Sequence, residues 1–353
     1  MIIYPNNSGL RYMGRIDFKD PTAPVFIFPG TSVCMKFTGN RLKIFLKNKR
    51  AYWDNYIGYF LDGKQGCAKL PEEGAVVLDL SDQLGAEGAA QNDTHEILLF
   101  KRQDACHEVT FCGFELADHG RVLPLKELPE RKLEVYGDSV SAGEVSEAVQ
   151  YTGKEDPSHK GEFSNSWYSF AWMTARKLNA QIHDIAQGGI ALLDGTGWFQ
   201  EPDYIGMERI WDKLHYHPAF GKAVSWDFTN YIPQAVVIAL GQNDSHPDDY
   251  MKRDYDCEKA IFWRKRYKEF IQKIRKQYPK AYIICCTTLL SHDASWDRAI
   301  DQVCTELDDG KVTHYIFKRN GTGTPGHLRI SEAEEMAEEL SAYIEQLSIE
   351  GWE

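Results

Sequence analysis

Four short polar motifs in the second half of the chain each follow an apolar run of strand length. The first is segment 137–143, Gly-Asp-Ser-Val-Ser-Ala-Gly, directly after residues 132–136. A serine at such a strand-to-helix turn can attack an acyl carbon, and its own N–H can stabilise the oxyanion that forms. Ser139 is therefore a candidate nucleophile, although serine is also a common helix N-cap. The segment is not the G-x-S-x-G elbow of α/β-hydrolases, because position 141 is serine.

Two further motifs offer hydrogen-bond donors to an oxyanion. Gly188 and Gly189 follow the second apolar run of this half, and glycine permits a turn that exposes a backbone N–H. Asn243 follows the third run, and its amide is a neutral donor whose protonation state does not change. Taken singly, both motifs are also typical of ordinary turns at strand ends. We predict that Asn243 and one of the two glycines complete an oxyanion hole with the N–H of Ser139.

The candidate general base is His327, which follows the last apolar run. Neutral imidazole is the usual acceptor for a serine proton near pH 7. Most of the eleven histidines are expected to be structural or solvated, but His327 has the position in the chain that brings it beside the loop of the first strand. His246 is the alternative. Three histidines belong to the first half and are set aside: His95, His107 and His119.

The elements that must position these residues alternate between strands and helices. Apolar runs of strand length occupy residues 132–136, 181–186, 235–240, 281–287 and 312–317. Helical patterns, with apolar residues three and four apart, occupy residues 167–178, 257–278 and 331–347. This alternation predicts a flavodoxin-like three-layer α/β domain over residues 124–353, with its ligand site at the carboxyl ends of the strands.

The first half has a different pattern, with short alternating segments and no helical period. Predicted strands occupy residues 31–38, 41–47, 55–61, 75–80, 96–101 and 108–116. Asp62-Gly63 is a hairpin motif, and Gly, Asn and Asp separate the other segments. Residues 1–123 are therefore predicted to form an antiparallel β-sandwich of the jelly-roll type.

The composition excludes several classes of partner. The net charge of -12 opposes binding to nucleic acid or to an anionic membrane surface. No apolar run approaches the eighteen or more residues of a membrane span. The N-terminus lacks the basic and long apolar regions of a secretory signal, so we expect a cytoplasmic protein. The eight cysteines form no C-x-x-C pair and no zinc spacing, and we expect neither a metal nor a cofactor.

Aromatic residues in the predicted loops could bind a sugar, because an apolar sugar face stacks on a flat ring. Trp198 and Trp296 both fall in segments after predicted strands, and Tyr151 lies in the polar loop 144–164. The tryptophans on predicted helices are expected in the core: Trp167, Trp172 and Trp263.

The order of the four motifs resembles the SGNH hydrolase superfamily. Residues 137–139 look like its first block, a glycine of 188–189 its second, Asn243 its third and His327 its fourth. The whole chain also resembles carbohydrate esterase family 2, whose members place a jelly-roll domain before an SGNH domain and deacetylate polysaccharides. The segments that carry this second resemblance are 100–102, 112–116 and 131–139.

The chain departs from the common SGNH pattern at three positions. Ser141 replaces the usual Thr, Leu328 replaces the Pro that often follows the base, and Thr324 stands where an Asp often precedes the His by three residues. The resembling family is known for a Ser-His dyad whose histidine is oriented by a backbone carbonyl. The resemblance therefore implies such a dyad, in which a main-chain carbonyl holds the imidazole of His327.

The acids nearest to the base in sequence are then not expected to orient it. Asp308 and Asp309 precede the last strand, Glu332 follows the loop, and residues 318–330 contain no Asp or Glu. Loss of any of these three carboxylates should cost less activity than loss of His327.

The resemblance implies an esterase that removes acetyl groups from xylo- or manno-oligosaccharides of plant origin by acyl transfer through Ser139. Two alternatives differ in class. One is an SGNH esterase or thioesterase acting on a non-carbohydrate acyl ester, which would favour an apolar acyl tunnel. The other is a carbohydrate-binding protein without catalytic activity, which retention of all four motifs disfavours.

Ser139→Ala should abolish hydrolysis of p-nitrophenyl acetate and leave the fold intact, because the motifs make this hydroxyl the only nucleophile. Turnover and the circular dichroism spectrum of the purified variant check this. Near wild-type turnover with an unchanged spectrum would refute the assignment.

Overall fold

The computed structural model describes residues 1–84 and 94–352, which divide into two compact units. The first unit contains Met1–Leu128, Lys160–Glu162 and Leu214–Ala223, and the second contains Pro129–His159, Phe163–Lys213 and Val224–Glu353. The main boundary falls after Leu128, whereas the sequence predicts it after residue 123.

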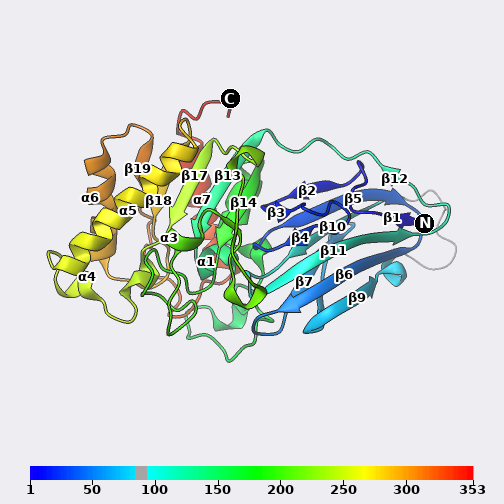
Figure 1. Ribbon diagram of the computed structural model, residues 1–353, viewed down its shortest axis with the longest axis horizontal. Coiled ribbons are helices and arrows are strands. Elements are labelled where there is room, and N and C mark those ends of the chain that lie inside the picture. Colours follow the sequence, from blue (N-terminus) through cyan, green and yellow to red (C-terminus); the bar gives the residue numbers. More distant parts are fainter. Residues whose placement is uncertain (85–93, 353) are drawn as a thin grey trace. The chain divides into compact units, whose positions relative to one another are not determined.

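The first unit is an antiparallel β-sandwich, with its strands coloured blue to cyan in Figure 1. One sheet has the order β3 (Ile16–Asp17), β4 (Val25–Phe26), β11 (His107–Leu116), β6 (Leu42–Arg50) and β9 (Glu73–Asp79), with β1 (Ile2–Ile3) also paired to β11. The other has the order β12 (Val122–Leu123), β5 (Ser32–Thr38), β10 (Thr94–Lys101), β7 (Tyr56–Leu61) and β8 (Lys64–Lys69), with β2 (Arg11–Met13) also paired to β5.

Alternation of side chains explains why the six predicted strands form. In β6, Leu42, Ile44 and Leu46 are buried in the core while Lys47 is exposed. The hydrophobic pattern does not predict strand β8, because its sequence, Lys-Gln-Gly-Cys-Ala-Lys, has little apolar surface to bury. It pairs with β7 through the Asp62-Gly63 turn, where both residues have positive φ, as a two-residue hairpin requires.

Two short segments from the second half of the sequence belong to the first unit. The Asp54 N–H donates to the carbonyl of Lys160 (2.8 Å). A Cβ at Gly161, where φ is +101°, would collide with the Gln103 side chain. His215 lies between two carboxylates, those of Glu108 (2.8 Å) and Asp17 (2.9 Å). Both segments are therefore integral parts of this unit.

The second unit is built on a five-stranded parallel sheet. Its order is β14 (Ala180–Ala186), β13 (Arg131–Gly137), β17 (Ala235–Ala239), β18 (Tyr282–Cys286) and β19 (Val312–His314). This 2-1-3-4-5 order is that of flavodoxin, as the sequence predicts. The larger helices are α2 (Phe170–Lys177), α5 (Glu258–Gln277), α6 (Ala294–Leu307) and α7 (Ile330–Ile344), of which α2 packs on α7 and α5 packs on α6.

The remaining elements are short. They are the helices α1 (Ser139–Ala142), α3 (Met207–Ile210) and α4 (Tyr250–Arg253), the strands β15 (Lys213–His215) and β16 (Val224–Ser225), and the 3-10 turns η1 (Ser81–Leu84), η2 (Val149–Tyr151), η3 (Ser166–Tyr168), η4 (Pro218–Phe220), η5 (Phe228–Asn230) and η6 (Gln242–Ser245). Among the described residues, no helix is long and apolar enough to cross a membrane.

Trp296 lies in helix α6 and is fully buried, so its expected place in a sugar-binding loop is wrong. Asp293 caps the helix by accepting the N–H of Ser295 (3.0 Å). The Trp296 ring contacts Trp263, and its Nε1 donates to Asp249 (3.1 Å). The sequence does carry the helical signature, with apolar residues at 296, 299, 300, 303 and 304, but the polar residues before it resemble a continuing loop.

Trp296→Ala should therefore lower the free energy of unfolding by about 3 to 5 kcal/mol, the usual cost of removing a buried large aromatic side chain. Urea unfolding of the full chain measures this. Trp198→Ala is the control, because its side chain is 54% exposed and the change should cost far less. Equal losses of unfolding free energy in the two variants would contradict the conclusion that Trp296 is a buried core residue.

Candidate active site

Ser139 begins helix α1 directly after strand β13 and is buried. Asp138 caps this helix by accepting the N–H of Val140 (3.0 Å). Gly143 ends it with φ at +75°. A Cβ at Gly137 would collide with the Ser141 side chain, so only glycine fits at the end of the strand. These constraints fix the backbone that carries the serine.

The asparagine motif is tied directly to the serine motif, because β13 and β17 are adjacent in the sheet. Asn243 Nδ2 donates to the Asp138 carboxylate (2.9 Å) and to the carbonyl of Ile190 (3.0 Å). Gln242 donates to the same carboxylate (2.5 Å). Burial raises the pKa of Asp138 to about 6, although the bonds from Val140 and Gln242 oppose this. Both amide hydrogens of Asn243 thus have acceptors, and its oxyanion role stays a prediction.

The glycine motif follows β14, on the other side of β13. Gly189 has φ at +71°, and its carbonyl accepts the N–H of Trp198 (2.7 Å). A Cβ at Gly189 would lie 2.8 Å from that of Trp198. Gly188 accepts the amide of Gln187 through its carbonyl (3.2 Å). Donation of a glycine N–H to an oxyanion therefore stays a prediction.

Trp198 presents a flat surface beside this motif. It is more than half exposed and stacks on the imidazole of His246, with ring centroids 3.3 Å apart. His246, the alternative base, is thus engaged with an aromatic ring. Tyr151, in turn η2, is partly exposed.

The imidazole of His327 is held by the carboxylate of Asp156. Nδ1 lies 2.7 Å from Oδ2, and the His327 main-chain N–H donates to Oδ1 (3.0 Å). Arg329, which is fully buried, forms an ion pair with the same carboxylate (2.9 Å). The expected main-chain carbonyl does not occupy this position, so the dyad prediction is corrected to a carboxylate-oriented histidine. Asp156 was missed because it lies 171 residues before His327, in the polar loop 144–164.

The three acids near His327 in sequence have other partners. Asp309 forms an ion pair with Arg275 (2.8 Å), and Asp308 ends helix α6 with φ at +48°. Glu332 accepts both the N–H (2.8 Å) and the hydroxyl (2.6 Å) of Thr324, the residue in the usual Asp position. Glu332 therefore holds the backbone of the histidine loop instead of the imidazole.

The loops that carry Ser139 and His327 meet at Glu144. The main-chain N–H of Glu144 donates to the carbonyl of Ser139 (2.9 Å), and its carboxylate lies 3.7 Å from Nε2 of His327. Burial lowers the pKa of His327, but Glu144 and Asp156 outweigh it and raise this pKa to about 8. Burial also raises the pKa of Asp156, but His327 and Arg329 outweigh it and lower this pKa to about 2. An ionised Asp156 can therefore stabilise a protonated imidazole.

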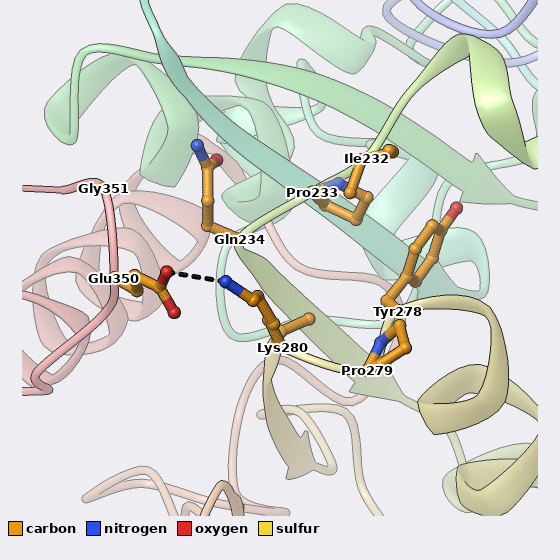
Figure 2. A pocket seen from close by; sticks show the side chains of 9 residues that line it. Ile232, Pro233, Gln234, Tyr278, Pro279, Lys280, Glu350 and Gly351 are labelled. Carbon is orange, nitrogen blue, oxygen red and sulfur yellow. Dashed lines mark hydrogen bonds and ion pairs between the residues drawn. The ribbon is translucent and has the colours of Figure 1, made fainter.

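The second unit has a cavity of about 460 Å³ whose lining contains none of these motif residues, and Figure 2 shows the side chains that line it. Its lining comes from residues 232–234, 278–281 and 350–351. These segments directly precede β17 and β18 or lie near the C-terminus, so the cavity opens at the amino ends of the strands. Ser139, Gly189 and Asn243 instead follow the carboxyl ends of β13, β14 and β17.

A serine after the first strand of this sheet and a carboxylate-held histidine before the last helix form the arrangement that the SGNH pattern predicts. The family model described as carbohydrate esterase 2 N-terminal matches residues 12–125. A solved active-site mutant of a family two carbohydrate esterase from Clostridium thermocellum is 30% identical, with a TM-score of 0.77 over 96% of this chain and 98% of that one. The chain belongs to carbohydrate esterase family 2.

Two further proteins are similar along nearly the whole chain. The cellulase/esterase CelE of Acetivibrio thermocellus is 33% identical over 350 residues, which make up 96% of this chain. The chain spans only 39% of the length of CelE. The acetylxylan esterase / glucomannan deacetylase of Cellvibrio japonicus is 24% identical over 344 residues, with 96% of this chain and 88% of that protein covered.

Asp156→Asn should lower kcat on p-nitrophenyl acetate by about 10²- to 10⁴-fold with little change in KM, because the neutral amide disturbs the tautomer and no longer stabilises imidazolium. Steady-state kinetics test this. Asp309→Asn is the control and should cost less than about tenfold. If the loss of kcat in the Asp156 variant is no larger than in the control, the Ser-His dyad predicted from the sequence would be favoured instead.

Proposed function

We propose that this protein is a serine esterase that removes O-acetyl groups from xylo- or manno-oligosaccharides. The observation that carries the proposal is the His327–Asp156 pair, which Glu144 links to the turn that bears Ser139, in a chain of a carbohydrate esterase family. The arrangement has the parts of a catalytic triad drawn from three segments of the chain.

The reaction proceeds by two acyl transfers. Ser139 Oγ attacks the acetyl carbonyl while His327 Nε2 takes the hydroxyl proton, and Asp156 stabilises the imidazolium that forms. The N–H groups of Ser139 and of Gly188 or Gly189, with the Asn243 amide, would stabilise the oxyanion. When the ester bond breaks, imidazolium returns its proton to the sugar oxygen. Water then attacks the acetyl-serine as His327 takes a proton from it, and the imidazolium returns this proton to Ser139 Oγ as the acyl-serine bond breaks and acetate leaves.

Donation by Asn243 requires a hydrogen that is now bonded to Asp138 or Ile190. A shared hydrogen bond, or a small rotation of the amide toward the substrate, would supply it. If the hydrogen now bonded to Ile190 is the one donated, the bond to Asp138 still keeps the amide close to Ser139, because Asp138 directly precedes that residue.

The sugar would stack on Trp198. An exposed ring backed by His246 is rigid, and a rigid aromatic surface loses little conformational entropy when it binds a pyranose. Tyr151 is a second candidate contact, from the loop that also carries Asp156.

The names of the relatives support a substrate with a β-linked polysaccharide backbone. The Cellvibrio relative is named as acting on acetylated xylan and glucomannan, and a Clostridium thermocellum structure of this family, 29% identical, holds cellohexaose. Acetate release from acetylated xylo-oligosaccharides, acetylated glucomannan oligosaccharides and p-nitrophenyl acetate tests the proposal. Turnover of the nitrophenyl ester alone would favour a non-carbohydrate acyl substrate instead.

Trp198→Ala should reduce kcat/KM for acetylated oligosaccharides by about tenfold or more and change that for p-nitrophenyl acetate little, since only the sugar uses the ring. Parallel kinetics on both substrates measure the difference. Equal losses on both would show that Trp198 supports Gly189 structurally, since the two residues are in contact.

A further inference from the structure

Glu144 contributes a second carboxylate to the imidazole of His327. Its side chain is 10% exposed, and its Oε1 lies 3.7 Å from Nε2. Nε2 is the nitrogen that exchanges a proton with Ser139 in the proposed mechanism, because Nδ1 is bonded to Asp156. The main-chain bond from Glu144 to the Ser139 carbonyl keeps this carboxylate close to the nucleophile turn.

The charged groups around His327 are mostly negative. Asp156 faces Nδ1, Glu144 faces Nε2, and Asp138 acts at longer range. The nearby cation is Arg329, whose guanidinium pairs with Asp156. An imidazolium therefore has carboxylates at both nitrogens, whereas a neutral imidazole can donate to only one of them.

We propose that Glu144 acts through His327 as a second carboxylate partner, which holds the imidazolium in the resting enzyme and stabilises it again when Ser139 attacks. The proposal rests on the esterase mechanism given above. Glu144 gains no proton in it: the Ser139 proton moves to Nε2 as the Oγ–C bond forms, and it moves to the sugar oxygen as the ester bond breaks.

Two opposite effects on the rate follow. Below the pKa of His327, Glu144 favours the protonated ring, which cannot accept a proton, so it slows the reaction. Each unit by which a variant lowers this pKa raises the neutral fraction there about tenfold. Above the pKa, the ring is already neutral and Glu144 helps by stabilising the imidazolium of the transition state. Removal of its charge should therefore make the two pH profiles cross.

The test compares wild type, Glu144→Gln and the control Glu147→Gln in kcat/KM for p-nitrophenyl acetate between about pH 5.5 and about pH 9.5. Glu147 lies in the same loop, and its carboxylate accepts the Asn165 amide (2.7 Å). The wild-type rate should rise with pH through about 8, the pKa of His327. The Glu144 variant should reach its half-maximum at lower pH, with several-fold higher activity at the acid end and a lower plateau. The control should keep the wild-type midpoint.

A uniform loss in the Glu144 variant, with the midpoint unchanged, would overturn the proposal. If this variant does not fold, Glu144→Asp is the alternative, because it keeps the negative charge but moves it away from His327. It should shift the midpoint of the pH profile in the same direction by a smaller amount. An unshifted midpoint in the Glu144→Asp variant would also overturn the proposal.

A titration of the imidazole by NMR separates this proposal from the esterase function. In the Ser139→Ala background, the further change Glu144→Gln should lower the pKa of His327. An unchanged pKa refutes the role of Glu144 even if the esterase is confirmed. Acetyl ester hydrolysis by the Ser139→Ala protein would instead refute the nucleophile assignment, and the titration would still show whether Glu144 and His327 interact.

Discussion

The arrangement of the candidate catalytic residues depends on one carboxylate, that of Asp156. It accepts hydrogen bonds from the ring and the main chain of His327 and pairs with the buried guanidinium of Arg329. A guanidinium fully removed from water is stable only with a close counter-charge. Because Arg329 also donates to the carbonyl of His327 (2.5 Å), the ion pair fixes the loop as well as the imidazole. The stability of this loop and the orientation of the His327 imidazole therefore depend on the same interaction.

The parallel sheet brings the other groups within reach of this pair. Strand β13 lies between β14 and β17, so the serine, glycine and asparagine motifs leave three neighbouring strands at one edge. Asn243 joins the other two motifs, because its amide donates to the Asp138 carboxylate and to the carbonyl of Ile190, the residue directly after Gly189. On the histidine side, Glu332 binds Thr324 and caps helix α7, so the start of that helix and the loop before it have a common anchor.

Local pattern was sufficient to predict most of the fold. Alternating or continuous apolar runs identified the strands that have a core to bury, and strand ends located Ser139, Asn243 and His327. The sequence pattern could not predict Asp156 as the partner of His327, because this pairing depends on how two distant loops meet in space. The sequence pattern also missed strand β8, whose side chains bury little apolar surface. Trp296 was misplaced because a single capping residue, Asp293, turns a polar segment into a helix start.

The path of the chain also bears on how far the two units are independent modules. Residues 160–162 and 214–223 are parts of the β-sandwich although the sequence around them belongs to the other unit. A chain cut before Pro129 would leave Lys160 without the N–H of Asp54 and His215 without Glu108 and Asp17. Lys160 lies only four residues after Asp156. In evolution or in domain exchange, the sandwich should therefore be inherited with the hydrolase as one unit, unlike a carbohydrate-binding module attached through a linker.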